Sequence, residues 1–185
     1  MQKNLILKMI KILSEFILNK VLGWKVDGFL PVNDKYIIAV VPHSSYFDLI
    51  VAVLIRTYSG LKIKFIGKKE LFNPITSFFF KFLGGIPVDR KKNSNLVDAV
   101  VDLFKKNKIE ILAIAPEGTR KKVNKWKTGF YFIALKTELP ILMVSFDYDR
   151  KEVKINNKFH PTGNIDKDFN KLKEMVSDVI LRNKI

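Results

Sequence analysis

The sequence predicts an α/β fold in which a mixed, largely parallel sheet is flanked by helices. Short runs rich in β-branched residues alternate with segments of helical periodicity, and this alternation is typical of α/β domains. The strand-like runs are 36–41, 62–66, 109–115 and 140–146, and the main helical segments are 47–57, 94–106 and 128–137. With 185 residues and no internal repeat, low-complexity tract or linker, the chain predicts a single domain, 1–185.

Composition limits the partners and the chemistry. The formal net charge of +15 predicts an anionic partner: nucleic acid, an acidic membrane surface or a phosphorylated substrate. The absence of cysteine excludes disulfides, thiolate metal sites and a cysteine nucleophile. His160 stands alone among lysine and asparagine, so no metal is implied. No signal-peptide cleavage site follows the first apolar stretch, and no window approaches the ~18 apolar residues of a membrane span. We therefore expect a protein on the cytoplasmic side.

The first 22 residues predict an amphipathic helix that precedes an α/β core over 23–185. Lysines border its broad apolar face, which at 100° per residue comprises Leu5, Ile6, Met9, Ile10, Ile12, Leu13, Phe16 and Ile17. A helix of this kind either lies in a membrane interface or packs on the core of its own protein, and the periodicity favours neither.

Several other segments have weaker patterns. Residues 24–29 predict a short strand, 152–155 an edge strand and 166–182 a closing helix. The very apolar segment 75–83 contains four phenylalanines and is too short to span a bilayer. We interpret it as core, the alternatives being the lining of an acyl-chain groove or an element that dips into a membrane interface.

The turn over 42–48 holds one of only two histidines, between a predicted buried strand and a predicted helix. His43 would lie at the carboxyl end of the strand, where open α/β sheets bind ligands. Asp48, in the first helical turn, would reach back to the imidazole, fix its tautomer and stabilise the imidazolium formed when it takes a proton. From these residues alone a second interpretation stays open: Ser45 and Asp48 have the spacing of a helix capping box, with His43 an ordinary loop residue.

Two more turns after apolar runs carry charged residues beside glycines, Asp89–Arg90 and Glu117–Arg120. In a largely parallel sheet all three turns would meet at one edge. Glycines allow backbone amides to approach an anion closely, and the planar arginine fork binds two phosphate oxygens at once. The combination predicts a general base beside a phosphate-binding site.

Four ordered blocks in this chain resemble those of the glycerolipid acyltransferases, which include 1-acylglycerol-3-phosphate acyltransferase. They are His43-x4-Asp48, the segments 85–90 and 116–120, and Leu139-Pro140-Ile141; Lys68 to Leu71 also resembles the family's pattern. The resemblance implies transfer of a fatty acyl group from a thioester donor to a free glycerol hydroxyl of a lysophospholipid in phospholipid biosynthesis. The acceptor would be lysophosphatidic acid and the product phosphatidic acid.

In this interpretation His43 and Asp48 are catalytic. Arg90, Arg120 and Lys68 bind the acceptor's phosphate, Glu117 and Gly118 shape the pocket, and Thr119 supplies a hydrogen bond. No cofactor is implied: acyl-coenzyme A or acyl-acyl carrier protein is a co-substrate. The lipid substrates imply peripheral attachment to the cytoplasmic side of the cell membrane.

Other functions are compatible with the same sequence. The acceptor could be another lyso-lipid such as a lyso-aminolipid, or water, which would make the protein a hydrolase. A non-catalytic module binding acidic lipid or RNA would also use the positive charge. No RNA-binding motif is present and the aromatic residues lie in apolar runs, so we expect no nucleic-acid partner. Acyl-chain length, the donor and the oligomeric state are not determined by the sequence.

Overall fold

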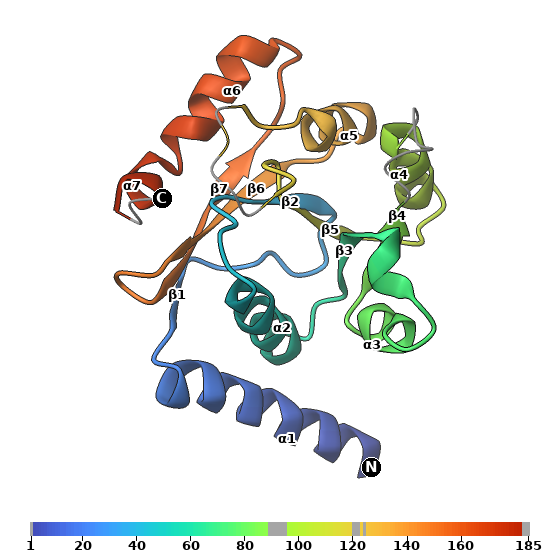
Figure 1. Cartoon of the computed structure of the whole chain (residues 1–185), viewed down its shortest axis with the longest axis vertical. Helices are drawn as coiled ribbons and strands as arrows, with labels where there is room; N and C mark the ends of the chain where they lie inside the picture. The colour runs from blue at the N-terminus through green and yellow to red at the C-terminus, as the bar shows by residue number, and fades with distance from the viewer. Residues whose placement is uncertain (1, 89–95, 120–122, 124, 183–185) are drawn as a thin grey trace.

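The structure, a computed structural model, describes residues 2–88, 96–119, 123 and 125–182. Two predicted site residues, Arg90 and Arg120, lie outside these residues. The described strands form one seven-stranded sheet in the order β1-β7-β6-β2-β5-β3-β4 (Figure 1). Their bounds are β1 Lys25–Asp27, β2 Tyr36–Val40, β3 Ile63–Lys68, β4 Gly85–Val88, β5 Ile111–Ile114, β6 Ile141–Asp147 and β7 Glu152–Phe159. Neighbouring strands are parallel except β6 and β7, which are antiparallel. The predicted α/β class, with its largely parallel sheet, is confirmed.

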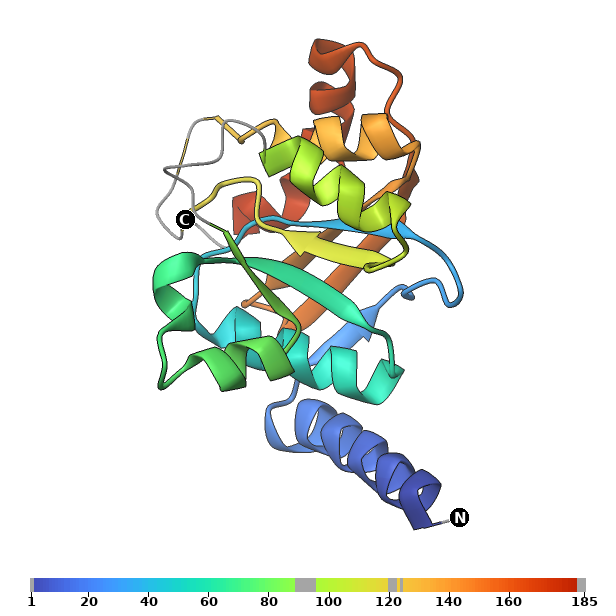
Figure 2. The ribbon, with the colours of Figure 1, turned by 90° about the vertical axis from the view of Figure 1, so that its right-hand side faces the viewer.

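Helices lie on both sides of the sheet. On one side are α1 (Gln2–Phe16), which continues into a π-helical turn (Ile17–Val21), α2 (Phe47–Ser59) and α3 (Ser77–Phe82) (Figure 2). On the other are α4 (Leu96–Lys105), α5 (Gly129–Thr137) and α6 (Ile165–Glu174), followed by α7 (Ser177–Arg182). A 3-10 turn, Lys69–Phe72, connects β3 to α3. The sheet is therefore the middle layer of three.

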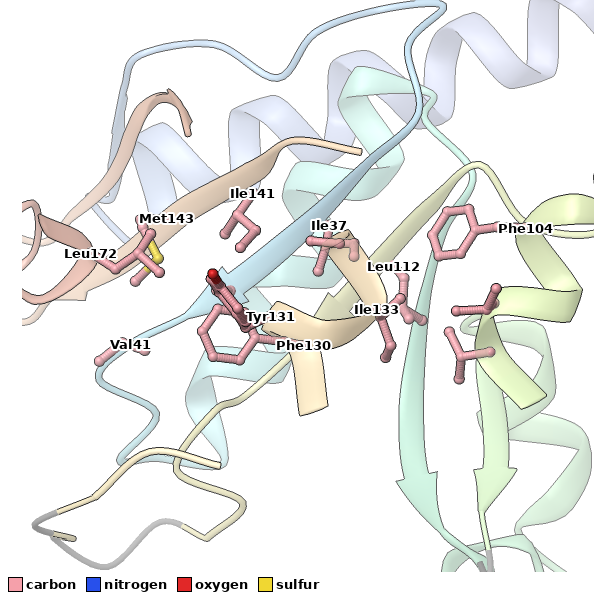
Figure 3. Packing of buried hydrophobic residues seen from close by; sticks show 14 of the residues in the cluster. Ile37, Val41, Phe104, Leu112, Phe130, Tyr131, Ile133, Ile141, Met143 and Leu172 are labelled. Carbon is pink, nitrogen blue, oxygen red and sulfur yellow. The ribbon is translucent and has the colours of Figure 1, made fainter. Parts of the chain in front are cut away.

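The central strands are buried on both faces, which explains their almost continuous apolar sequence. In β2, Ile37 and Ala39 point to a cluster with α4, α5 and α6, while Tyr36 and Ile38 point to a second cluster with α2. The first cluster includes Phe104, Phe130, Tyr131 and Ile133 around Leu112 and Met143 (Figure 3). The second includes Trp24, Val51, Ile55 and Phe146. Together the two clusters fix β2, and with it the position at which the histidine turn begins.

Three predictions of the outer elements are wrong. The apolar segment 75–83 is not core: Ile75, Phe78 and Phe82 are 90%, 82% and 71% exposed. The predicted edge strand at 152–155 is β7, which lies between β1 and β6. The closing helix is two helices, α6 and α7, interrupted after Glu174.

One element was not predicted as a strand at all. Residues 85–88, which precede the predicted turn at Asp89–Arg90 and were assigned to no element, form β4 at the edge of the sheet. Proline has no N–H for a second ladder, and Pro87 is tolerated there because an edge strand pairs on one side only.

The helix α1 does not pack into the core. Its apolar side chains over residues 5–16 are 45–62% exposed, and among residues 4–16, whose burial the structure describes, Ser14 alone is buried. The helix lies against α2, with most of its apolar face exposed. Leu18, in the π-helical turn that follows, is fully buried and anchors the end of the segment beside Trp24. Within the described residues, no helix is both long enough and apolar enough to cross a membrane.

Candidate active site

The histidine turn connects the carboxyl end of β2 to the first turn of α2. His43 Nδ1 lies 2.9 Å from Asp48 Oδ2. An ionised carboxylate can only accept a hydrogen bond, so Nδ1 carries the hydrogen and Nε2 of the neutral ring is the basic nitrogen. The Asp48 side chain is 3% exposed and that of His43 26%, so the carboxylate is buried while the ring reaches the surface.

Asp48 also holds the start of α2. Its Oδ2 accepts a hydrogen bond from the Ser45 backbone N–H at 3.2 Å, and Ser45 Oγ accepts one from the Phe47 N–H at 3.0 Å. In the first of these bonds an acidic side chain reaches back to a preceding amide, as in a capping box. The box is incomplete, because the N-cap of α2 is Tyr46 and Ser45 Oγ accepts its hydrogen bond from Phe47 instead of Asp48. The same carboxylate therefore ties down the chain that enters the helix and orients the imidazole.

The remaining oxygen of Asp48 is held from a distant part of the chain. Tyr148, in the turn between β6 and β7, donates its hydroxyl hydrogen to Asp48 Oδ1. Its ring meets the indole of Trp24 edge-on, with the ring centroids 5.1 Å apart. Desolvation and the hydrogen bond to Asp48 raise the pKa of Tyr148 to about 12, so the hydroxyl remains a donor at neutral pH.

Glu117 meets the histidine turn from the loop after β5, because β5 and β2 are neighbouring parallel strands. Its Oε2 accepts a hydrogen bond from the His43 backbone N–H at 2.8 Å. Desolvation raises the pKa of Glu117, although the His43 amide and imidazole favour its charged form; the negative charge of Asp48 adds to the rise. Glu117 therefore positions the backbone of the candidate base.

The structure places the other described site residues at the same edge of the sheet. Lys68 ends β3, which is two strands from β2 in the sheet. The spacing between strands puts the backbone of β3 about 10 Å from that of β2. Gly118 has a positive φ of 66° in the turn after β5, and Thr119 follows it at the surface. Hydrogen bonds join His43 directly to Asp48 and Glu117, whereas Lys68 makes none with these three residues in the described part of the chain.

Two residues at this edge were missed from the sequence. Tyr148 directly follows a fully buried strand. Its position at the carboxyl end of that strand could have indicated a site residue. Lys127 was not singled out either. A β-carbon added to Gly118 would lie 2.9 Å from the Lys127 Nζ, so this ammonium stands over the glycine turn.

This arrangement defines an α/β protein with a buried carboxylate, an oriented imidazole and lysines at one edge of a parallel sheet. Chemically it can take a proton from a hydroxyl while lysines attract an anionic group nearby. Among the described residues no group of three or more histidine or acidic side chains could hold a metal ion.

Comparisons with known proteins give the family. The acyltransferase family model matches residues 25–147, which include His43, Asp48 and Glu117 and end one residue before Tyr148, and the chain belongs to the acyltransferase family. The family predicted from the ordered motifs is thereby confirmed. No curated protein matches the sequence.

The fold is similar to that of a solved structure described as the 1-acyl-sn-glycerophosphate acyltransferase PlsC from Thermotoga maritima. The TM-score is 0.63 at 21% sequence identity, over 94% of this chain and 78% of that one. At this identity the similarity shows a shared fold.

Proposed function

We propose that the protein transfers a fatty acyl group from an acyl thioester to the free glycerol hydroxyl of lysophosphatidic acid. The observation that carries this proposal is the His43–Asp48 pair, held at the carboxyl edge of a parallel sheet in an acyltransferase-family chain. The likeness to a lysophosphatidic acid acyltransferase supports the choice of acceptor.

The chemistry requires a base and no enzyme nucleophile. A thiolate is a good leaving group, because a thiol has a pKa of ~8.5, far below that of an alcohol. His43 Nε2 takes the proton of the acceptor hydroxyl as the oxygen bonds to the thioester carbonyl carbon. The carbon–sulfur bond then breaks, and the imidazolium returns the proton to the departing sulfur. Asp48 stabilises the positive ring between these steps.

The acceptor's phosphate would bind beside the base. We assign this role to Lys68, Arg90 and Arg120, with Lys127 as an additional cation. Glu117 would shape the pocket through its hydrogen bond from the His43 amide, which engages one of its oxygens with the backbone. Gly118 and Thr119 would complete the rim of the pocket.

A donor and acceptor panel tests the proposal. Purified protein is given palmitoyl-acyl carrier protein or palmitoyl-coenzyme A, each with lysophosphatidic acid, a lyso-aminolipid or no acceptor. We expect thiol release that requires lysophosphatidic acid and yields phosphatidic acid, with one donor preferred. Thiol release without acceptor would identify a thioesterase instead, and product from the lyso-aminolipid alone would change the acceptor class.

A further inference from the structure

The largest exposed apolar side chains are distributed unevenly over the molecule. In the described residues they lie in or next to α1, α2 and the segment 71–82, apart from Phe29 and Val32 between β1 and β2 and Phe132 on α5. The helices α1, α2 and α3 lie on the same side of the sheet (Figures 1 and 2). Water-soluble monomers rarely expose large contiguous apolar patches, so this side is suited to an apolar partner.

The α3 segment contributes the most exposed of these side chains. Ile75, Phe78 and Phe82 are each more than 70% exposed, and Phe79 is 56% exposed. By contrast, Leu83 at the end of the helix is 7% exposed and anchors it. The segment thus has one anchored side and several aromatic rings that project into solvent.

Lysines predominate among the charged residues of the stretch that carries these rings. The stretch 60–83 contains five lysines and one acidic residue, Glu70. Lys62, Lys68, Lys69 and Lys81 are exposed. Aromatic residues among lysines fit the interface of an anionic bilayer, where the rings enter the acyl boundary and the ammonium groups meet lipid phosphates.

We propose that the α3 segment, residues 75–82, is a membrane-docking element that binds anionic lipid surfaces on the same side as α1. The occupant is a bilayer surface, because an apolar patch bordered by lysines complements acyl chains bordered by phosphates. The segment follows Lys68 at the carboxyl edge of the sheet, so docking there would bring the candidate site to the lipid. This inference rests on the proposed function only for its lipid substrates.

The test is binding to vesicles made of equal parts phosphatidylglycerol and phosphatidylcholine. The double variant Phe78→Ser/Phe82→Ser removes two rings that are mostly in solvent, so the fold should be retained; circular dichroism checks this. The matched control is Phe132→Ser, on α5 across the sheet. We expect the double variant to bind vesicles about tenfold more weakly and the control to bind like wild type. Undiminished binding by the double variant would overturn the proposal.

Two further measurements exclude other occupants. Analytical ultracentrifugation compares the oligomeric state of wild type and the double variant. If wild type is a dimer and the double variant is a monomer that still binds vesicles normally, the face is covered by a second copy. If binding is unchanged but transfer to a monomeric short-chain lysophosphatidic acid is lost, the rings belong to the substrate site. Either result contradicts docking. The binding measurement needs no activity, so failure of the proposed function would appear separately.

A separate observation concerns Tyr148. Asp48 has both oxygens occupied, Oδ2 by His43 and Ser45 and Oδ1 by Tyr148, and Trp24 packs against the Tyr148 ring. We infer that Tyr148 is a positioning residue that acts on His43 through Asp48. Without its hydroxyl, Asp48 Oδ1 would lose a donor, and the carboxylate charge would act more strongly on the imidazole.

Nuclear magnetic resonance of the two histidines tests this role. In Tyr148→Phe we expect the titration midpoint of the His43 ring to move to higher pH, while His160 serves as the internal reference. Tyr58→Phe, at the far end of α2, is the control and should leave both midpoints unchanged. Glu117 also faces His43, so the comparison is repeated with both proteins carrying Glu117→Gln. There too we expect Tyr148→Phe to move the His43 midpoint to higher pH. An unmoved His43 midpoint in Tyr148→Phe would assign Tyr148 a structural role only.

Discussion

Asp48 is the residue on which the site depends, because it serves the helix start, the imidazole and a distant tyrosine at once. Sequence spacing predicted the first two roles, since Ser45, Asp48 and His43 are close neighbours along the chain. The third contact joins residues 100 positions apart. No local pattern could have given that contact, because it depends on β6 lying beside β2.

Glu117 provides a pH-dependent test at the same scale. A raised pKa means that the folded protein holds this proton more tightly than the unfolded chain does. The free energy of unfolding therefore falls as the pH rises from the ordinary value of 4.5 through the raised pKa. Glu117→Gln keeps an acceptor for the His43 amide and removes this dependence.

Urea unfolding of wild type and Glu117→Gln across this pH range measures the effect. We expect the variant to gain stability relative to wild type as the pH rises. A stability difference that stays constant with pH would contradict the raised pKa.

The elements of the outer layers differ most from their predicted places. The core strands were predictable because burial on both faces demands continuous apolar sequence. The α3 segment has equally apolar sequence, so composition alone could not show that its rings point to solvent. Likewise β4 resembles a turn, because glycine and proline are typical of turns and its edge position is a property of the whole sheet.

The attachment of α6 gives a prediction at the scale of elements. Asp168 is 1% exposed and accepts hydrogen bonds from the Tyr131 hydroxyl at 2.8 Å and the Thr162 backbone N–H at 2.6 Å. Asp168→Ala leaves these donors unsatisfied and should lower the free energy of unfolding by about 2 kcal/mol. The control Asp166→Ala, exposed on the same helix, should change it by less than about 0.5 kcal/mol.

The pH dependence of this attachment follows from the same carboxylate. Burial disfavours its charge, but the hydrogen bonds from Thr162 and Tyr131 outweigh burial and hold the pKa of Asp168 below its usual range. Its contribution is thus present above the unfolded-state pKa and is lost as the pH falls. Equal denaturant midpoints for Asp168→Ala and wild type at neutral pH would contradict this account.

At the scale of the whole molecule, the net charge of +15 predicts how the protein meets lipid. Lysines near an anionic surface each contribute about 1 kcal/mol to binding at moderate ionic strength. We expect binding to phosphatidylglycerol-containing vesicles to exceed binding to pure phosphatidylcholine by more than about tenfold and to weaken with added salt. Equal binding to the two lipid compositions would show that charge does not direct the contact.

The central claim is that His43 is the base for acyl transfer, and the most direct measurement is product formation by three proteins. Wild type, His43→Ala and the control His160→Ala are compared for phosphatidic acid formed from palmitoyl thioester and lysophosphatidic acid. We expect His160→Ala to match wild type and His43→Ala to lose a factor of about 10³ in kcat while melting at a similar temperature. Product formation by a folded His43→Ala variant at near wild-type rate would contradict the assignment.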